Sequence, residues 1–272
     1  MNKNPYICSM KKIILIVLVI LIARSCLSQM ANPTQYNEWE TSNSYIAGGT
    51  AVMLGSMIAI ATKSPIEITP QVGPAINWLR PDQELSKLFQ EYGTKTGSIW
   101  GYSAGAMIGI KRGNLTYNSG LFAESKGGTY STNTQAIMTD SYGTPNLVNL
   151  DTKSTTRLNY LTIPLMIGVQ TKDTSKTRLS LNLGGFISLP ISESHQMTNN
   201  GITSNFEPLS KIGPDAGIMA DAGIKIPMTN RLDFAIDARF LSSLSDAMKI
   251  QQMGKSFNQS VQLLFGLNIK IN

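Results

Sequence analysis

The sequence is poor in the residues that most often build metal centres and catalytic sites. It has two cysteines, Cys8 and Cys26, one histidine, His195, and only 15% charged residues. Both cysteines precede residue 30, so the chain beyond that point has no disulfide and no cysteine-based metal site. Histidines are not clustered either. We therefore expect no metal, no cofactor and no catalytic residue of these classes.

Long apolar runs are scarce outside the N-terminus. The run from Ile13 to Ala23 follows two lysines and ends in a polar exit near Ser28. This pattern predicts a secretory signal peptide over residues 1–29, with Met1 or Met10 as the true start. A retained membrane anchor is the alternative, but the run is shorter than the roughly 20 residues that a spanning helix needs. A lipoprotein signal at Cys26 fits poorly, because Ala23 and Arg24 precede it.

Excess basic charge is also missing from the mature chain. The whole sequence has a formal net charge of +6, but residues 1–29 contain four basic residues and no acid. Their removal leaves 19 basic and 17 acidic side chains. This near balance excludes nucleic acid as a partner on charge grounds.

Alternating apolar and polar residues fill the rest of the chain. Period-two alternation over ten to fifteen residues is typical of β-strands. It recurs eight times: Ile66 to Trp78, Ser98 to Lys111, Asn114 to about Lys126, Arg157 to Thr171, Thr177 to Pro190, Asp215 to Ile226, Arg231 to Ser242, and Ser260 to Ile271. One parity carries Leu, Ile, Val and aromatic residues. The other carries Gly, Ser, Asn and all the charge of the central span.

Short and long links alternate between these stretches. The links "RGN", "KDTSK" and "PMTN" are short and turn-like. The other four are long and polar: residues 80–97, 127–156, 191–214 and 243–259. Short turns at one end of a sheet and long loops at the other are typical of outer-membrane barrels.

The solvent explains this alternation. Backbone N–H and C=O groups without a hydrogen-bond partner are very costly in hydrocarbon, so a sheet in lipid must close on itself. Its outer face must be apolar because it contacts the lipid. A soluble barrel is the alternative, but it would turn the glycine- and serine-rich parity to water, with too few Lys and Glu for such a surface. We therefore predict an all-β fold: an eight-stranded antiparallel up-and-down transmembrane β-barrel over residues 65–272, with short periplasmic turns and long extracellular loops.

Three segments resemble a known family. They are "YLTIPLMIGV" (160–169), "GPDAGIMADAGIKIPMTNRLDFAIDARFLSSLSD" (213–246) and "VQLLFGLNIKI" (261–271). They look like the PorT-like outer-membrane β-barrel domain, and the resemblance covers about residues 65–272. It implies an eight-stranded outer-membrane barrel and, for the namesake of the family, a part in protein secretion across that membrane.

Charged residues of the inward parity are the main candidate site. They are Lys111, Glu124, Asp221, Lys225, Asp233, Asp237 and Arg239. Unpaired charges in a narrow lumen are costly, so we expect ion pairs across neighbouring strands, with Arg239 bound to Asp237, Asp221 or Glu124. A structural plug of salt bridges is one interpretation. A gated polar path for a small solute is the other.

Aromatic residues near the long-loop ends of the strands predict an outer girdle. Trp78, Trp100, Tyr102 and Phe240 have this position. Ordinary packing on a sheet is the alternative. In the first long loop, residues 82–93 have helical spacing, which predicts a lid over the rim or a docking helix.

Two features fit the barrel less directly. His195 lies in the third predicted loop, where we expect it to be solvated, although a surface hydrolase would need such a histidine. Residues 45–61 are apolar but broken by glycine, so we expect a periplasmic helix within an N-terminal segment, 30–64. An inner-membrane anchor or a segment shared with a partner are the alternatives.

The sequence thus predicts a non-enzymatic, monomeric barrel of the outer membrane. Its partners are membrane lipid and, through the loops or residues 30–64, other envelope or secretion proteins. Its role is structural or accessory. A narrow solute channel is the runner-up.

Overall fold

A computed structural model describes residues 64–139, 145–171, 177–205, 213–246, 248–250 and 254–271. The one helix in these ranges is α3 (Gln83–Glu91). The strands are β1 (Ile66–Pro81), β2 (Lys95–Arg112), β3 (Leu115–Thr139), β4 (Pro145–Gln170), β5 (Arg178–Asn199), β6 (Ile202–Asn205), β7 (Asp215–Pro227), β8 (Leu232–Ser243), β9 (Met248–Ile250) and β10 (Gly254–Ile271). Within the described residues, no helix is long and apolar enough to cross a membrane.

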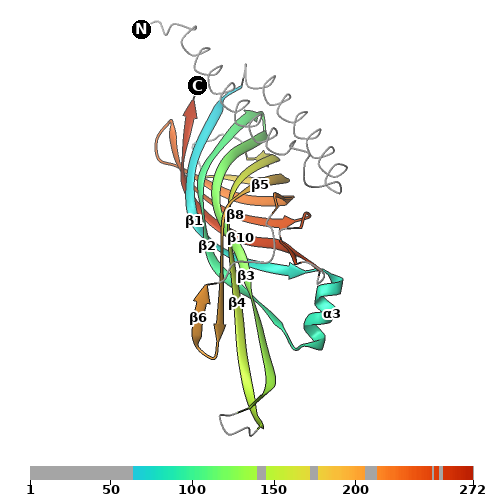
Figure 1. The fold of residues 1–272 in the computed structure, drawn as a ribbon. Coiled ribbons are helices and arrows are strands. Elements are labelled where there is room, and N and C mark those ends of the chain that lie inside the picture. The colour runs from blue at the N-terminus through green and yellow to red at the C-terminus, as the bar shows by residue number, and fades with distance from the viewer. Residues whose placement is uncertain are drawn as a thin grey trace, which may run out of the picture.

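Eight strands close into a barrel (Figure 1). Each pairs antiparallel with its neighbours in the order β1, β2, β3, β4, β5, β7, β8, β10, and β10 returns to β1. The closing register runs from Ile66 opposite Ile271 to Pro81 opposite Ser256. Closure pairs the backbone groups of every strand on both sides, as lipid requires. The predicted eight-stranded antiparallel barrel is therefore confirmed.

The two faces of the barrel follow the predicted parity. On β5, Leu179, Leu181 and Leu183 point outward and are between 53% and 61% exposed, whereas Asn182 between them is buried. On β10, Val261, Leu263 and Leu267 are exposed, whereas the inward Gln262 and Leu264 are buried. An apolar outer surface of this kind is what a hydrocarbon solvent selects.

The barrel has two unlike ends. The β2–β3 and β7–β8 connections are short, and β1 starts and β10 ends beside them, so we name this the turn end. At the opposite loop end lie α3, β6, β9 and the far parts of β3, β4 and β5 (Figure 1).

Among the described residues, much of two predicted long loops is paired strand. β3 and β4 pair from Leu115 opposite Val169 as far as Thr139 opposite Pro145. β5 likewise continues to Asn199, where a turn leads into β6. We name residues 131–139, 145–157, 192–199 and 202–205 the loop-end ribbon; in Figure 1 it runs out beyond the barrel. The long polar links predicted at 127–156 and 191–214 thus contain paired strands in their described parts, because polar residues also form strands in water.

One glycine of β3 lies shortly before the start of the loop-end ribbon. Gly127 has a φ of +131°, and a Cβ atom there would lie 2.1 Å from the backbone oxygen of Thr156 on β4. Only glycine combines that backbone angle with so close an approach. The β3–β4 ladder continues past it without interruption.

The predicted signal peptide at 1–29 and the predicted helix at 45–61 lie outside the described residues. Both stay predictions.

Candidate functional site: the layered interior of the barrel

Side chains fill the barrel interior in layers, beginning at the turn end with an inner ion-pair network. Arg178 on β5 is buried, and its Nη1 lies 3.1 Å from Oε1 of Glu67 on β1. Its Nη2 contacts Oδ2 of Asp233 on β8. Lys225 also contacts Glu67, and Lys270 lies 3.2 Å from the second oxygen of Asp233. Five strands, β1, β5, β7, β8 and β10, are thus tied together at this end.

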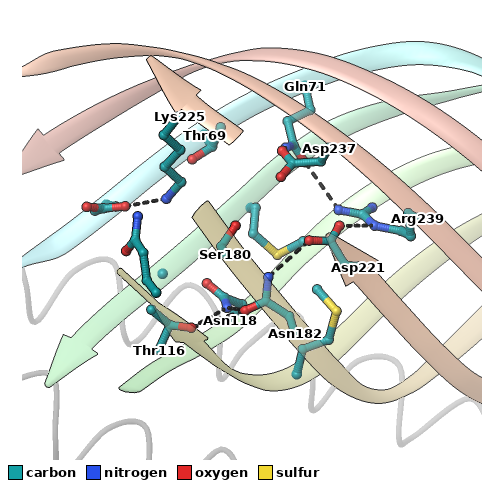
Figure 2. A pocket seen from close by; sticks show the side chains of 15 residues that line it. Thr69, Gln71, Thr116, Asn118, Ser180, Asn182, Asp221, Lys225, Asp237 and Arg239 are labelled. Carbon is teal, nitrogen blue, oxygen red and sulfur yellow. Dashed lines mark hydrogen bonds and ion pairs between the residues drawn. The ribbon is translucent and has the colours of Figure 1, made fainter. Parts of the chain in front are cut away.

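A central network follows, deeper in the lumen (Figure 2). Nε of Arg239 lies 3.1 Å from Oδ2 of Asp221 on the neighbouring strand. Its Nη2 donates to Oε1 of Gln71 at 3.3 Å, and the Gln71 amide nitrogen donates to Asp237. Asn182 donates to the other oxygen of Asp221 at 3.0 Å. Amide side chains thus link the charged ones.

An apolar layer crosses the lumen next. It consists of buried inward side chains from seven strands: Met107, Phe122, Met166, Phe186, Met219, Leu241 and Leu264. Side chains of this size fill the width of an eight-stranded barrel.

Inward glycines make room for the apolar layer. In the strand register Phe122 lies opposite Gly105, Met107 opposite Gly120, and Phe186 opposite Gly217. A Cβ atom on Gly105 or Gly217 would lie 2.8 Å from the facing phenylalanine ring. Large and small residues therefore interlock across the interior. The glycine-rich parity, which the sequence suggested was simply small and polar, is one half of a packed core.

An outer network covers the apolar layer toward the loop end. Nζ of Lys126 lies 3.4 Å from Glu124 and 3.3 Å from Asp215, and it donates to Ser188 at 3.0 Å. Glu124 also accepts from Gln262 at 2.9 Å. These groups are almost fully buried, so each charge is compensated by protein partners rather than by water.

The cations of the two networks rest on aromatic rings of the apolar layer. The Arg239 guanidinium lies 4.6 Å from the centre of the Phe122 ring, on the turn side. Lys126 Nζ lies 4.4 Å from the centre of the Phe186 ring, on the loop side. Such cation–π contacts are strongest in desolvated surroundings. They join the polar and apolar layers into one continuous plug.

The predicted charge cluster is divided among these layers. Lys225 and Asp233 lie in the inner network, Asp221, Asp237 and Arg239 in the central one, and Glu124 in the outer one. Lys111 lies on the inward face of β2 near the turn end. The sequence interpretation omitted Glu67, Lys126, Arg178 and Asp215 from the cluster, although each is buried. All four lie near the ends of the predicted strands. A charged residue there is also compatible with a solvated turn, so the sequence did not indicate that these residues are buried.

The predicted girdle residues lie on the outer face near the loop end. Trp100 is 68% exposed, and Tyr102 and Phe240 are exposed as well. Ile76 lies opposite both Trp100 and Val261, and Val261 lies opposite Phe240, so one row of pairs crosses four strands. Trp78 donates to Gln259 at 2.6 Å, which suits an indole at a polar boundary.

His195 is neither in a loop nor solvated, contrary to the prediction. It lies in β5, is 5% exposed, and its Nδ1 is 3.2 Å from Thr156 Oγ1. Its Nε2 lies 3.3 Å from Oε2 of Glu193. The order Thr, His, Glu resembles a catalytic chain, but Thr156 is only 2% exposed and so is closed to a substrate. The arrangement is typical of a satisfied structural histidine.

Helix α3 packs at the rim, and the predicted helix at 82–93 is confirmed. Asp82 caps it by accepting from the Leu85 backbone nitrogen at 2.8 Å. Phe89 packs edge-on against Tyr130, with ring centres 5.0 Å apart. The Tyr130 hydroxyl bonds Ser256 at 2.8 Å, and burial raises the pKa of this phenol to about 12. Tyr130 therefore stays neutral at physiological pH.

These features define a class of protein: a closed antiparallel barrel with an apolar outer face and a filled interior. The sequence agrees, because residues 61–249 match the family model described as "Outer membrane protein beta-barrel domain". The chain belongs to this family, and its place is the outer membrane, in contact with membrane lipid. Within the described residues, no group of His, Cys, Asp or Glu is arranged to hold a metal ion.

Solved structures with a similar fold are outer-membrane proteins at low identity. Neisserial surface protein A is 13% identical with a TM-score of 0.37, and the match covers 74% of this chain and 96% of that one. OprG from Pseudomonas aeruginosa is 11% identical with a TM-score of 0.37, covering 76% and 96%. Ail from Yersinia pestis, solved with a heparin analogue, is 10% identical with a TM-score of 0.30, covering 75% and 99%. No curated protein sequence matches this chain significantly.

Proposed function

We propose that the protein is a non-conducting barrel that anchors the loop-end ribbon and α3 outside the outer membrane as an interaction surface. The apolar layer supports this proposal most directly. It lies across the lumen between two networks of buried ion pairs, and a solute on a polar path would have to pass through packed methionine, phenylalanine and leucine side chains.

The alternative of a narrow solute channel has less support. Channels of this architecture keep a polar, water-filled interior, whereas small barrels of eight strands are filled by side chains. Ion pairs join neighbouring strands on the turn side and on the loop side of the apolar layer. A continuous solute path through the lumen would therefore require several buried ion pairs to break. An enzymatic role has less support still, because the described histidine is buried beside a buried hydroxyl.

Conductance across a planar lipid bilayer tests the proposal. The wild-type barrel is expected to give no discrete current steps. A variant with Phe122→Ala and Phe186→Ala is expected to give small steps, because it removes the two rings on which Arg239 and Lys126 rest. Reproducible wild-type steps that persist after purification to homogeneity would support the channel instead.

An accessory role in protein secretion is the more specific form of this proposal, as the PorT-like resemblance implies. It predicts that cells lacking the protein fail to release a secreted protein, and that the wild-type chain restores release. A chain with residues 131–153 replaced by a two-residue turn, which keeps Tyr130 opposite Ser154, is expected to assemble but not to restore it. Restoration by the shortened chain would place the secretion role elsewhere in the molecule.

A further inference from the structure

A small cavity lies in the turn-end half of the lumen, below the apolar layer. Its volume of about 30 Å³ exceeds the roughly 10–15 Å³ that one water molecule needs. Met107 and Met166 form part of its lining, and the remaining lining is mainly carboxylate, amide and hydroxyl groups (Figure 2).

The basic groups that line this cavity are bound to other carboxylates. Lys225 contacts Glu67, and Arg239 contacts Asp221. Asp237 is held instead by the amide of Gln71. Among the described residues, Asp237 has no ion pair with a basic side chain, although it is only 5% exposed. A buried carboxylate without a countercharge is costly.

A second, independent feature of the same cavity points to a missing partner. Gln170 on β4 lines the cavity and is 3% exposed, yet neither its amide oxygen nor its amide nitrogen has a hydrogen-bond partner among the described residues. Buried amides in folded proteins are nearly always satisfied. A bound species that offers contacts to Gln170 would remove this exception.

The strand register places Asp237 and Gln170 at the two ends of one row. Gln170 lies opposite Ser180, Ser180 opposite Gly223, and Gly223 opposite Asp237. Asp237 leans across the glycine, since a Cβ on Gly223 would lie 1.9 Å from Asp237 Oδ1 and 2.8 Å from Ser180 Oγ. A carboxylate, a hydroxyl and an amide oxygen therefore come from one row of four positions, in which Gly223 separates Asp237 from Ser180.

The geometry points to a site for one small monovalent cation, Na⁺ or K⁺, bound by Asp237, Ser180 and Gln170. Hard oxygen donors of these types suit such ions. Of the carboxylates in the lining, Glu67 is paired with Lys225 and Arg178, and Asp221 with Arg239, so one monovalent cation beside Asp237 would supply the countercharge that it lacks. A divalent ion would leave an excess of positive charge. The cation enters from the turn end and stops at the apolar layer, so it is held rather than conducted.

Thermal unfolding of the full-length barrel in lipid vesicles tests the site. Ionic strength is kept constant with choline chloride, whose cation is too large for the cavity, while NaCl or KCl replaces it. The midpoint for loss of the compact form on unheated gels is expected to rise and saturate. At ten times the dissociation constant the rise is about 3–6 °C.

Variants assign the effect to this row. Asp237→Asn removes the carboxylate, and its midpoint is expected to be independent of Na⁺ and K⁺. Asp246→Asn is the matched control at the loop end, where Asp246 pairs with the half-exposed Lys255, and it is expected to keep the full response. If Asp237→Asn does not assemble, Gln170→Leu takes its place and is expected to raise the cation concentration needed for half the effect several-fold.

Three results would overturn the proposal. A wild-type midpoint that does not respond to Na⁺ or K⁺ means that water or a proton alone occupies the cavity. An equal response to choline means a general salt effect. A response that Asp237→Asn and Gln170→Leu leave unchanged places the cation elsewhere. None of these results bears on whether the apolar layer closes the lumen, which conductance tests separately.

Discussion

The barrel wall and the loop-end ribbon contain the same strands but turn different side chains outward. Along β5 the outward residues are Leu179, Leu181 and Leu183 in the wall, and after a bulge near Ile191 they are Ser194 and Gln196 in the ribbon. β4 changes in the same way, from the exposed Ile167 and Val169 in the wall to Arg157 and Lys153 in the ribbon. The hydrogen-bonded ladder between the strands continues across the change. Backbone pairing is thus common to both regions, and the solvent selects the outer face.

The interiors of the two regions differ as well. The barrel wall encloses a plug of buried ion pairs and packed apolar side chains. The loop end has ion pairs that water can reach, such as Lys255 with Asp246 at 3.0 Å. Buried charges that lose a partner are strongly destabilising, whereas exposed pairs contribute little. The same substitution should therefore have very different effects in the two regions.

The largest expected effect comes from breaking the inner network. Arg178→Met leaves Glu67 without one partner and Asp233 without another, both buried. We expect a loss of about 3–5 kcal/mol in the free energy of unfolding. Urea unfolding in lipid vesicles, followed by tryptophan fluorescence, measures it. The matched change Lys255→Met at the loop end is expected to cost about 0–1 kcal/mol. Equal losses for the two variants would contradict the distinction between the interiors.

A charged residue introduced on the outer face distinguishes the region that faces lipid from the region that faces water. Leu183→Lys places an ammonium group on the lipid-facing side of β5, at a cost of about 2–4 kcal/mol. Gln196→Lys makes the same change on the ribbon part of β5, where we expect less than about 0.5 kcal/mol. Both are measured by the same unfolding method. If Gln196→Lys were as harmful as Leu183→Lys, the ribbon would also lie in lipid.

The smallest expected effect concerns the boundary between the regions. Tyr130→Phe removes the hydroxyl that bonds Ser256 near α3, at a cost of about 0.5–1.5 kcal/mol at neutral pH. Because burial raises the pKa of this phenol from 10.0 to about 12, the folded state keeps its proton longer than the unfolded state. Wild-type stability should therefore fall as the pH rises from about 10 to 12. Unfolding of both proteins across this range should show a smaller fall for Tyr130→Phe, and parallel curves would contradict the buried phenol.

Period-two alternation was sufficient to predict the barrel, because lipid on one side requires it at every outward position. It correctly assigned Leu181 and Leu263 to the outer face, and Asn182 and Gln262 to the interior. The apolar layer was missed because Met107, Phe122 and Met166 are apolar residues on the parity that was assigned to polar contacts. Glycines opposite them were the available signal, since an inward glycine in a filled barrel indicates a large neighbour across the strand.

The ribbon and His195 show what alternation cannot predict. In water a strand and a loop can have the same polar composition, so the pairing of β3 with β4 beyond the barrel is visible only in the register. His195 was expected in solvent because its neighbours are polar, but the bulge near Ile191 turns it inward against Thr156. A one-residue shift reverses the face of every later residue in a strand.

Single cysteines test the central distinction most directly, because the chain has no cysteine beyond residue 29. Leu183→Cys, Met219→Cys and Gln196→Cys would each be labelled with a polarity-sensitive fluorophore after folding into vesicles, and quenched by either spin-labelled lipid or a water-soluble quencher. We expect lipid alone to quench the first and water alone to quench the third, while the second stays closed to the labelling reagent until the barrel is unfolded. Quenching of Leu183→Cys from water, or rapid labelling of Met219→Cys in the folded barrel, would contradict a lipid-facing wall around a sealed interior.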